Sequence, residues 1–445
     1  MNHLLQIIIL VLCSINFCIN KPRSINARKL TPAVKSEPFY LLTQDNLLGI
    51  STSFGTPEQD LMLTIDIGSE KTWIYKPLYL SDKSSTFTKE GSTLTQAQDL
   101  FTINGEASTD KMTYSEIELD KFNFILVDKI EGHEQFLGGL SLGRVYEDPK
   151  YSFLNKLTTS LQSQNAFSLQ FKPDENKGVL HIGDLGEEIK MQEKNVDSCP
   201  LINDGKTIKW GCKLASVFIG NFDYKSEDAP KEVSKTDNKT HYIINPKNYS
   251  TIIINENAHF ETIYNKIYGN KEFKEFLEKQ YFVGEIEKAC EAKTDEAKGE
   301  TVYVCSKSFK SKFQNLNFIF GDGLNLIIPK EDQLICNPDT KVCEFVVAFN
   351  NKITNFAFGI PLLRNYHTFF FNNDTKLYFL GEEKKFMVSL SSIIPETPKG
   401  GIGVLGWFFI VLLIIIVIAI ILRFALRKKT VTKKLIEDQI YSTFE

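Results

Sequence analysis

The sequence predicts a mostly β chain that is folded into two lobes and followed by one membrane-spanning helix. With 445 residues, the chain is longer than a single ordinary hydrophobic core organises. Short runs of β-forming residues, broken by Gly, Ser and Asn, recur in both halves from Tyr40 onward. Residues 404–422 carry no charge over 19 positions, which is about the length that crosses the hydrocarbon core of a membrane.

The strands expected in the first half run from Tyr40 to about Leu119, in segments such as DLMLTIDI and MTYSEIEL. Residues 152–161 place apolar side chains on one helical face, which predicts a short helix. The second half opens near Lys206 with further strands, and a longer amphipathic helix is expected over 259–280. Both halves thus share one order of elements: strands, then a loop at which an acid is expected, then more strands and a helix.

The two ends of the chain carry signs of export and anchoring. Residues 3–18 are apolar and N-terminal, as in a secretory signal peptide. Four basic residues follow the apolar run 404–422, so the positive-inside rule places the C-terminus in the cytoplasm. We expect a signal peptide (1–20), a basic segment that is a pro segment or a mature N-terminus (21–36), an N-terminal lobe (37–205), a C-terminal lobe (206–386), a stalk (387–403), a transmembrane helix (404–422) and a cytoplasmic tail (423–445).

Charge and tail sequence bear on partners and destination. Residues 36–422 carry 40 basic and 52 acidic residues, a net charge of −12, which does not suggest a nucleic-acid partner. The tail segment 441–444 (YSTF) fits a tyrosine-based sorting pattern for endosomes or lysosomes. The sequence therefore predicts a single-pass type I membrane protein of the secretory pathway, placed at the plasma membrane or in endosomes and lysosomes.

Cysteine and asparagine patterns agree with an exported domain. Six cysteines lie beyond the predicted signal peptide, an even number that argues for three disulfides. Cys199–Cys212 is the local pairing expected, and the other four cysteines allow three arrangements. Their spacing does not resemble a zinc site, and no cofactor is expected. The six cysteines are Cys199, Cys212, Cys290, Cys305, Cys336 and Cys343, and the candidate glycosylation sites are Asn238, Asn248 and Asn373.

Asp66 lies in the stretch LTIDIGSEKTWIY, a setting in which a carboxylate is costly unless it is hydrogen-bonded or used. The turn FGTPEQ (54–59), the run Asp66-Ile67-Gly68-Ser69 and Trp73 together resemble the first catalytic loop of pepsin-like aspartic peptidases. Four further segments are similar to that family in the right order, so the resemblance covers nearly all of residues 40–386. They are KSSTF (83–87), FLGGLSLG (136–143), NKGVLHIGD (176–184) and FGIPLLRNYHTFFFNNDTKLYFLG (358–381).

The resemblance implies a bilobal, mostly β fold with short helices and a cleft that takes a peptide or protein. In this family two aspartates, one from each lobe, share a proton and activate a water molecule. Asp66 matches the acid of the first lobe, and Gly68, Ser69 and Trp73 match the residues that support its loop. Ile67 stands where the family has a threonine that braces the two catalytic loops.

The second acid is the point at which the resemblance breaks down. The matching loop places Asn245 at the aspartate position, or Asn248 if the loop is shifted by three residues. An amide cannot accept or release a proton at useful pH. The flap segment departs as well, because it places Ile103 where the family carries a tyrosine.

The sequence therefore predicts a membrane-anchored relative of the aspartic endopeptidases that is catalytically impaired or inactive and binds peptides or proteins in its cleft. One alternative is an active endopeptidase that uses Asp66 with a second acid not yet placed. The other is a surface or adhesion protein that uses the same fold as a scaffold. Cleavage of a denatured protein at acidic pH separates the first two readings.

Overall fold

The computed structural model describes most of the chain between residues 34 and 388. The predicted signal peptide, transmembrane helix and cytoplasmic tail lie outside the described residues. Among the described residues, no helix is long and apolar enough to cross a membrane. The described ranges are 34–42, 47–132, 138–144, 148–172, 176–191, 196–202, 209–220, 231–236, 239–243, 250–321, 323–337, 340, 342–380 and 387–388.

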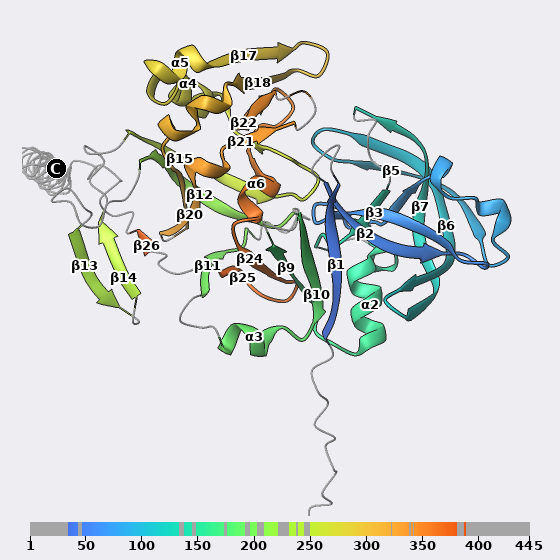
Figure 1. The fold of residues 1–445 in the computed structure, drawn as a ribbon. Helices are drawn as coiled ribbons and strands as arrows, with labels where there is room; N and C mark the ends of the chain where they lie inside the picture. The colour runs from blue at the N-terminus through green and yellow to red at the C-terminus, as the bar shows by residue number, and fades with distance from the viewer. Residues whose placement is uncertain are drawn as a thin grey trace, which may run out of the picture. The chain divides into compact units, whose positions relative to one another are not determined.

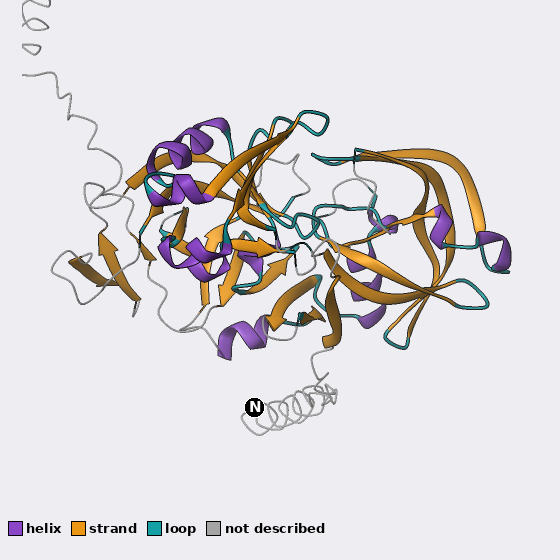
Figure 2. Ribbon diagram, turned by 45° about the horizontal axis from the view of Figure 1, so that its top comes forward, coloured by secondary structure: helices purple, strands orange, loops and turns teal. Residues whose placement is uncertain are grey.

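Two large sheets account for most of the described chain, and the helices are few and short (Figures 1 and 2). The first sheet has the strand order β11-β25-β24-β9-β10-β1-β2-β3-β8-β4-β7-β6-β5. Its strands are β1 (Val34–Leu42), β2 (Leu47–Phe54), β3 (Gln59–Asp66), β4 (Trp73–Tyr75), β5 (Thr88–Ala97), β6 (Thr102–Tyr114), β7 (Ile117–Glu131), β8 (Gly138–Ser141), β9 (Ala166–Lys172), β10 (Lys177–Gly183), β11 (Val196–Pro200), β24 (His367–Phe371) and β25 (Lys376–Leu380).

The second sheet is built from the later part of the chain. Its order is β13-β14-β26-β20-β19-β12-β15-β23-β16-β22-β18-β17, and β21 pairs with β22 off this path. Its strands are β12 (Gly211–Ile219), β13 (Lys231–Thr236), β14 (Lys239–Ile243), β15 (Ser250–Phe260), β16 (Ile267–Tyr268), β17 (Cys290–Asp295), β18 (Glu300–Cys305), β19 (Leu316–Phe320), β20 (Leu324–Ile328), β21 (Leu334–Cys336), β22 (Cys343–Asn350), β23 (Phe356–Phe358) and β26 (Met387–Val388).

Strands β24 and β25 come near the end of the chain but belong to the first sheet, where they lie between β9 and β11. Strand β24 pairs antiparallel with β9, so that Phe370 lies opposite Phe167. These two rings stack with centroids 4.4 Å apart, and Trp210 packs edge-on against both. Because these aromatic side chains come from both halves of the sequence, burying them ties the halves into one core.

Helix α2 (Phe153–Leu161) confirms the short helix predicted over 152–161. Its buried face carries Phe153, Leu154 and Leu157, and the Ser152 side chain caps it by accepting the Asn155 N–H. The remaining α-helices of the described residues are α3 (Gly186–Met191), α4 (Lys271–Gln280), α5 (Glu285–Ala289) and α6 (Ile360–Leu363).

The long helix expected over 259–280 is wrong in its first half. Strand β15 continues to Phe260, and β16 follows at Ile267–Tyr268, so the helix begins only at Lys271. Phe260 and Ile267 are buried in two different strands of the second sheet. Their spacing imitates a helical face because a strand, a loop and a second strand return to the same core.

Three disulfides join the six cysteines. Cys199–Cys212 confirms the local expectation. The other bonds are Cys290–Cys305 and Cys336–Cys343, and each joins residues that lie directly opposite each other on neighbouring antiparallel strands. Strand register thus decides among the three arrangements that the sequence left open.

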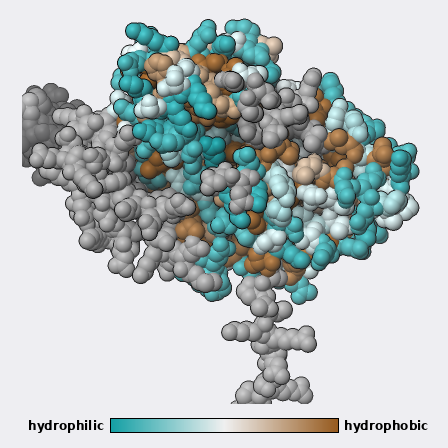
Figure 3. Space-filling model, in the orientation of Figure 1, coloured by the Kyte–Doolittle hydropathy of each residue, from teal (hydrophilic) through white to brown (hydrophobic). Residues whose placement is uncertain are grey.

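Hydrophilic and hydrophobic residues are interspersed on the face shown in Figure 3. Of the candidate glycosylation sites, Asn373 is exposed in the turn between β24 and β25. Asn238 and Asn248 lie outside the described residues. Glycosylation at all three stays a prediction.

Candidate active site

Asp66 is the last residue of β3 and is completely buried, with 0% of its surface exposed. Its Oδ1 accepts the Gly68 N–H at 3.1 Å. Its Oδ2 accepts from Gln98 Nε2 at 2.9 Å and from Trp73 Nε1 at 3.5 Å. Burial raises the pKa of Asp66, and the hydrogen bonds from Gln98, Trp73 and Gly68 oppose that rise. The carboxylate is buried but provided with donors.

The three residues predicted to support Asp66 take different places. Gly68 and Trp73 donate directly to the Asp66 carboxylate. Ser69 does not contact it; the Ser69 hydroxyl donates to the Lys71 carbonyl at 2.8 Å and accepts from Gln96 Nε2 at 2.5 Å. Ser69 therefore stabilises the turn after the acid.

The residues that follow β15 form a second loop, which begins at Glu261 and contacts the loop of Asp66. The Thr262 hydroxyl donates to the Ile65 carbonyl at 2.5 Å and accepts the Ile67 N–H at 3.2 Å. One buried side chain therefore bridges two backbone groups on either side of Asp66, across 195 residues of sequence to Ile67. Ile67 has no hydroxyl and cannot brace the two loops through its side chain. Thr262 of the second loop provides this brace.

The residue before this threonine is Glu261, and it faces the Asp66 loop. A Cβ placed on Gly68 would lie only 1.9 Å from Glu261 Oε2, so the carboxylate packs directly against the glycine. Glu261 is 1% exposed. Its own N–H donates to the Phe358 carbonyl of β23 at 2.9 Å, which fixes the loop to the second sheet. Two buried carboxylates thus lie on the two loops that Thr262 joins.

The electrostatic setting of Glu261 differs from that of Asp66. Burial raises the pKa of Glu261 to about 8, with help from the charges of Asp66 and Asp99. Lys209 works in the opposite direction, because its Nζ lies 3.4 Å from Glu261 Oε1. A carboxyl group in this position keeps its proton in mildly acidic solution.

The sequence predicts Asn245 at the second-acid position, or Asn248 if the loop is shifted. Both asparagines lie outside the described residues, and among the described residues Glu261 is the acid that packs against Gly68 in the Asp66 loop. This acid was missed because residues 259–280 were interpreted as a helix. The signal that would have found it is an acid followed by threonine, Glu261-Thr262, immediately after a strand.

Ile103, the residue expected at the flap position, lies in the hairpin of β5 and β6. That residue lies within β6, is fully buried and packs in one cluster with Trp73 and Phe101. The tip of the hairpin is the segment 98–101, closed by the Gln98 N–H donating to the Phe101 carbonyl at 2.8 Å. Gln98, not Ile103, is the hairpin residue that contacts Asp66.

The next residue of the tip, Asp99, joins the hairpin to the second loop. Its Oδ2 lies 2.5 Å from Lys209 Nζ, 3.0 Å from His259 Nε2 and 3.3 Å from the Tyr264 hydroxyl. Burial acts to raise the pKa of Asp99, but the His259 hydrogen bond and the Lys209 charge outweigh it and hold that pKa well below its usual range. Burial lowers the pKa of His259, so its imidazole is neutral near pH 7.

Asp99, His259 and Glu261 offer three ligand atoms within 4.8 Å of one another, which is close enough for a metal ion. The positive charge among them is the ammonium of Lys209. Because a protein cation already fills this place, we assign no metal to the group.

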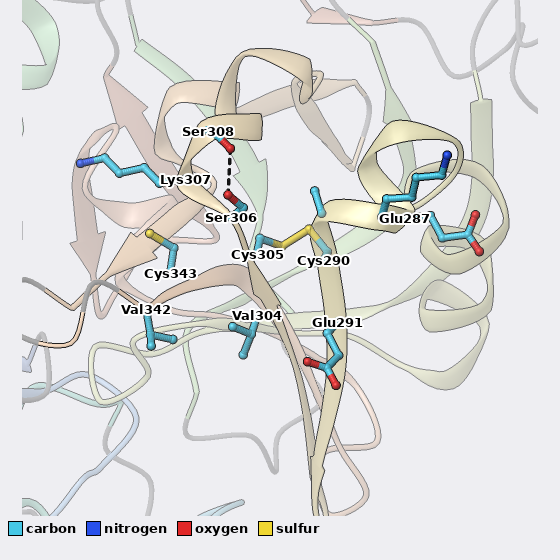
Figure 4. A pocket seen from close by; sticks show the side chains of 12 residues that line it. Glu287, Cys290, Glu291, Val304, Cys305, Ser306, Lys307, Ser308, Val342 and Cys343 are labelled. Atoms are coloured by element: carbon cyan, nitrogen blue, oxygen red, sulfur yellow. Dashed lines mark hydrogen bonds between the residues drawn. A yellow bond between two sulfur atoms is a disulfide. The ribbon is translucent and has the colours of Figure 1, made fainter.

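A separate pocket lies against α5, β17 and β18 (Figure 4). Its lining includes the Cys290–Cys305 disulfide, and Glu287 and Lys307 extend in opposite directions. None of its lining residues belongs to the Asp66–Glu261 site. Without convergent polar groups, the pocket gives no indication of a specific ligand.

Comparisons with known proteins show the fold and the family. The crystal structure of an aspartic proteinase from Irpex lacteus is similar, with a TM-score of 0.56 and 14% identity, over 78% of this chain and 97% of that chain. At this identity the likeness concerns the fold alone. A search of curated proteins finds no match. The sequence model described as eukaryotic aspartyl protease matches residues 49–380, and because that match spans more than half of the chain, this protein belongs to the pepsin-like aspartyl protease family.

Proposed function

We propose that this protein is an aspartic endopeptidase whose catalytic pair is Asp66 and Glu261. The observation that carries the proposal is the Thr262 bridge, which holds the Glu261 loop against the Asp66 loop. A carboxylate from each loop is the requirement of this chemistry, since one group cannot act as base and acid in the same step. The sequence alone left the second acid of an active endopeptidase without a position. The proposal assigns that role to Glu261.

The two acids have different roles in the proposed reaction. Two buried carboxylates that influence each other resist ionising together and share one proton. The three N–H donors at Asp66 favour its anion, which suits the base. The raised pKa of Glu261 favours its protonated form, which suits the acid. Their titration belongs to the pair and not to either residue alone.

The bond changes follow from these roles. Asp66 takes a proton from a water molecule, whose oxygen attacks the carbonyl carbon of the scissile peptide bond. Glu261 donates its proton to the carbonyl oxygen, and a tetrahedral gem-diol forms. Asp66 then gives the proton it took to the amide nitrogen, and Glu261 takes back a proton from one gem-diol hydroxyl as the C–N bond breaks. The products are an amine and a carboxylic acid, and both acids return to their starting protonation states. No cofactor takes part in these steps.

The structure represents a closed state of the proposed enzyme. Both acids are buried, and the hairpin tip donates to Asp66 through Gln98. A peptide bond reaches the pair only after this hydrogen bond breaks and the tip moves. Loops that open for substrate and close over it are a common device of enzymes that exclude water.

A second candidate is a peptide-binding relative without turnover. It is favoured by the side chain at position 261, which is one methylene longer than the aspartate of the family and lies near the Lys209 ammonium. In both candidates the protein is exported and anchored by residues 404–422, a proposal supported by the apolar run and the basic residues after it.

The test compares cleavage of a denatured protein by the ectodomain (residues 36–398) between pH 3 and 6. We expect Asp66→Asn and Glu261→Gln each to lower kcat about a hundredfold or more, because each removes a proton-transfer group. Glu261→Asp should keep measurable activity. Glu118→Gln is the matched control, since Glu118 pairs with Lys111 at the surface. Full activity of Glu261→Gln would rule out the pair, and an inactive wild type would favour the binding candidate.

A further inference from the structure

We propose that Lys209, His259 and Tyr264 form a subsite for an acidic side chain of the bound peptide, and that Asp99 occupies this subsite when the hairpin is closed. The inference deepens the proposed function, because it places the subsite beside the proposed catalytic pair. Asp99 then acts as an internal stand-in for a substrate carboxylate.

The contacts of Asp99 define the subsite. One carboxylate oxygen lies within 3.3 Å of an ammonium, an imidazole nitrogen and a phenol hydroxyl. Ammonium groups donate only, and here the imidazole and the phenol are turned toward the same acceptor. Convergent donors with one positive charge recognise a carboxylate and discriminate against the neutral amide of the same shape.

The subsite is held by parts of the protein other than the hairpin. His259 lies in β15 opposite Gly211 of β12, two residues after Lys209. Trp210 lies between Lys209 and Gly211 in the sequence. Its carbonyl accepts the Phe260 N–H at 2.8 Å, and its Nε1 donates to the Leu142 carbonyl at 3.0 Å. None of these contacts involves the hairpin, so departure of its tip removes Asp99 but leaves the backbone of Lys209 and His259 in place.

The location of the subsite connects it to cleavage. Glu261 Oε1 lies 3.4 Å from Lys209 Nζ and 3.8 Å from His259 Nε2. A peptide side chain bound in place of Asp99 would thus come from a residue close to the scissile bond. When Asp99 leaves, the ammonium of Lys209 loses the nearer of its two carboxylate neighbours, and a substrate carboxylate takes that place.

The experiment uses the full-length protein and peptides that share one apolar sequence. Glu or Gln replaces each residue of that sequence in turn, and kcat and KM are measured for every pair. At one position we expect the Glu peptide to be favoured about tenfold, because a charge-assisted hydrogen bond replaces a neutral one. Lys209→Met should abolish this preference. Lys76→Met is the matched control, because Lys76 forms an exposed ion pair with Asp128 away from the site.

A second variant tests the internal occupant and does not depend on Lys209. Asp99→Asn weakens the competitor, so the KM for the preferred Glu peptide should fall severalfold. Equal use of Glu and Gln peptides at every position by an active wild type would overturn the subsite. So would a Glu preference that survives Lys209→Met.

Binding separates failure of the subsite from failure of the proposed function. Fluorescein-labelled forms of the same peptides are titrated with Glu261→Gln protein, and anisotropy reports the Kd. A protein that cleaves nothing but binds Glu over Gln peptides supports the subsite and contradicts the proposed function. Equal Kd values for the two peptides would overturn the subsite whether or not the protein is active.

Discussion

At the scale of single residues, the most consequential one is Glu261. It stands after a strand and before a threonine, and its carboxylate packs against Gly68 in the loop of Asp66. The Glu261 carboxylate leaves no room beside Gly68, because even a methyl group on that glycine would collide with it. Its burial, its neighbours and its position make it the partner of Asp66 in the proposed reaction.

The raised pKa of Glu261 predicts how stability depends on pH. In the unfolded chain this carboxyl group ionises near pH 4.5, whereas in the folded protein its pKa is about 8. The contribution of the Glu261 carboxyl group to the free energy of unfolding is fully present below pH 4.5. It is lost as the pH rises to 8, because this group ionises first in the unfolded chain. The slope is at most about 1.4 kcal/mol per pH unit across this window.

Urea unfolding of wild type and Glu261→Gln at several pH values measures this dependence. We expect the free energy of unfolding of the wild type to fall relative to the variant between pH 4.5 and 8. Glu118→Gln, a change at an exposed ion pair, should follow the wild type. Parallel curves for wild type and Glu261→Gln would show that Glu261 does not retain its proton in the folded state.

Among the elements, the β5–β6 hairpin is the one that controls access to the two acids in the proposed function. Its tip contacts Asp66 through Gln98, and Asp99 of the tip accepts from Tyr264 of the second loop and from Lys209. Strand β6 itself is held along most of its length by β7. The tip also packs Phe101 against Trp73, whereas β6 behind it is paired with β7 along most of its length, so the tip is the part that separates first.

Asp99→Asn should loosen this tip without unfolding the hairpin. The change removes the negative charge that pairs with Lys209, so we expect amide hydrogen exchange about tenfold faster over residues 98–104. Exchange over the β6–β7 pairing at residues 106–113 should stay unchanged. Asp128→Asn serves as the control, since it removes a charge from an exposed pair with Lys76. Unchanged exchange at the tip would show that Asp99 does not hold it closed.

At the scale of the whole molecule, the two halves of the sequence form one folded unit. The strands β24 and β25 complete the first sheet although they come near the end of the chain. The stacked Phe167 and Phe370 rings and the Thr262 bridge connect the halves at two further points. The arrangement of the two acids therefore depends on the entire fold.

Anchoring is the prediction that belongs to the whole chain. Full-length protein made in a microsomal or cellular system should remain with membranes after carbonate extraction, whereas a chain that ends at residue 398 should be released. The reason is the apolar segment 404–422, which is long enough to span the hydrocarbon core. The variant Asn373→Gln provides a topology control: loss of a glycan-dependent mobility shift would place the exposed turn in the lumen. Extraction of the full-length chain into the soluble fraction would contradict the anchor.

Much of the fold follows from local sequence. The short runs of β-forming residues such as DLMLTIDI, the helical face at 152–161 and the nearby pair Cys199–Cys212 are set by residues close in sequence. The ordered motifs around Asp66 are local as well, and together they identify the family. The helix expected over 259–280 failed because apolar spacing alone does not distinguish a helix from two short strands.

Short stretches and their order were enough to predict the family, the mostly β two-lobed fold and the loop that carries Asp66. Folding in three dimensions was needed to show that Glu261 packs against this loop, that Gln98 and Asp99 lie in the hairpin tip, and how four of the cysteines pair. These features depend on register between strands and on contacts across up to about 200 residues of sequence. No local pattern encodes such contacts, since they arise when the two sheets pack together.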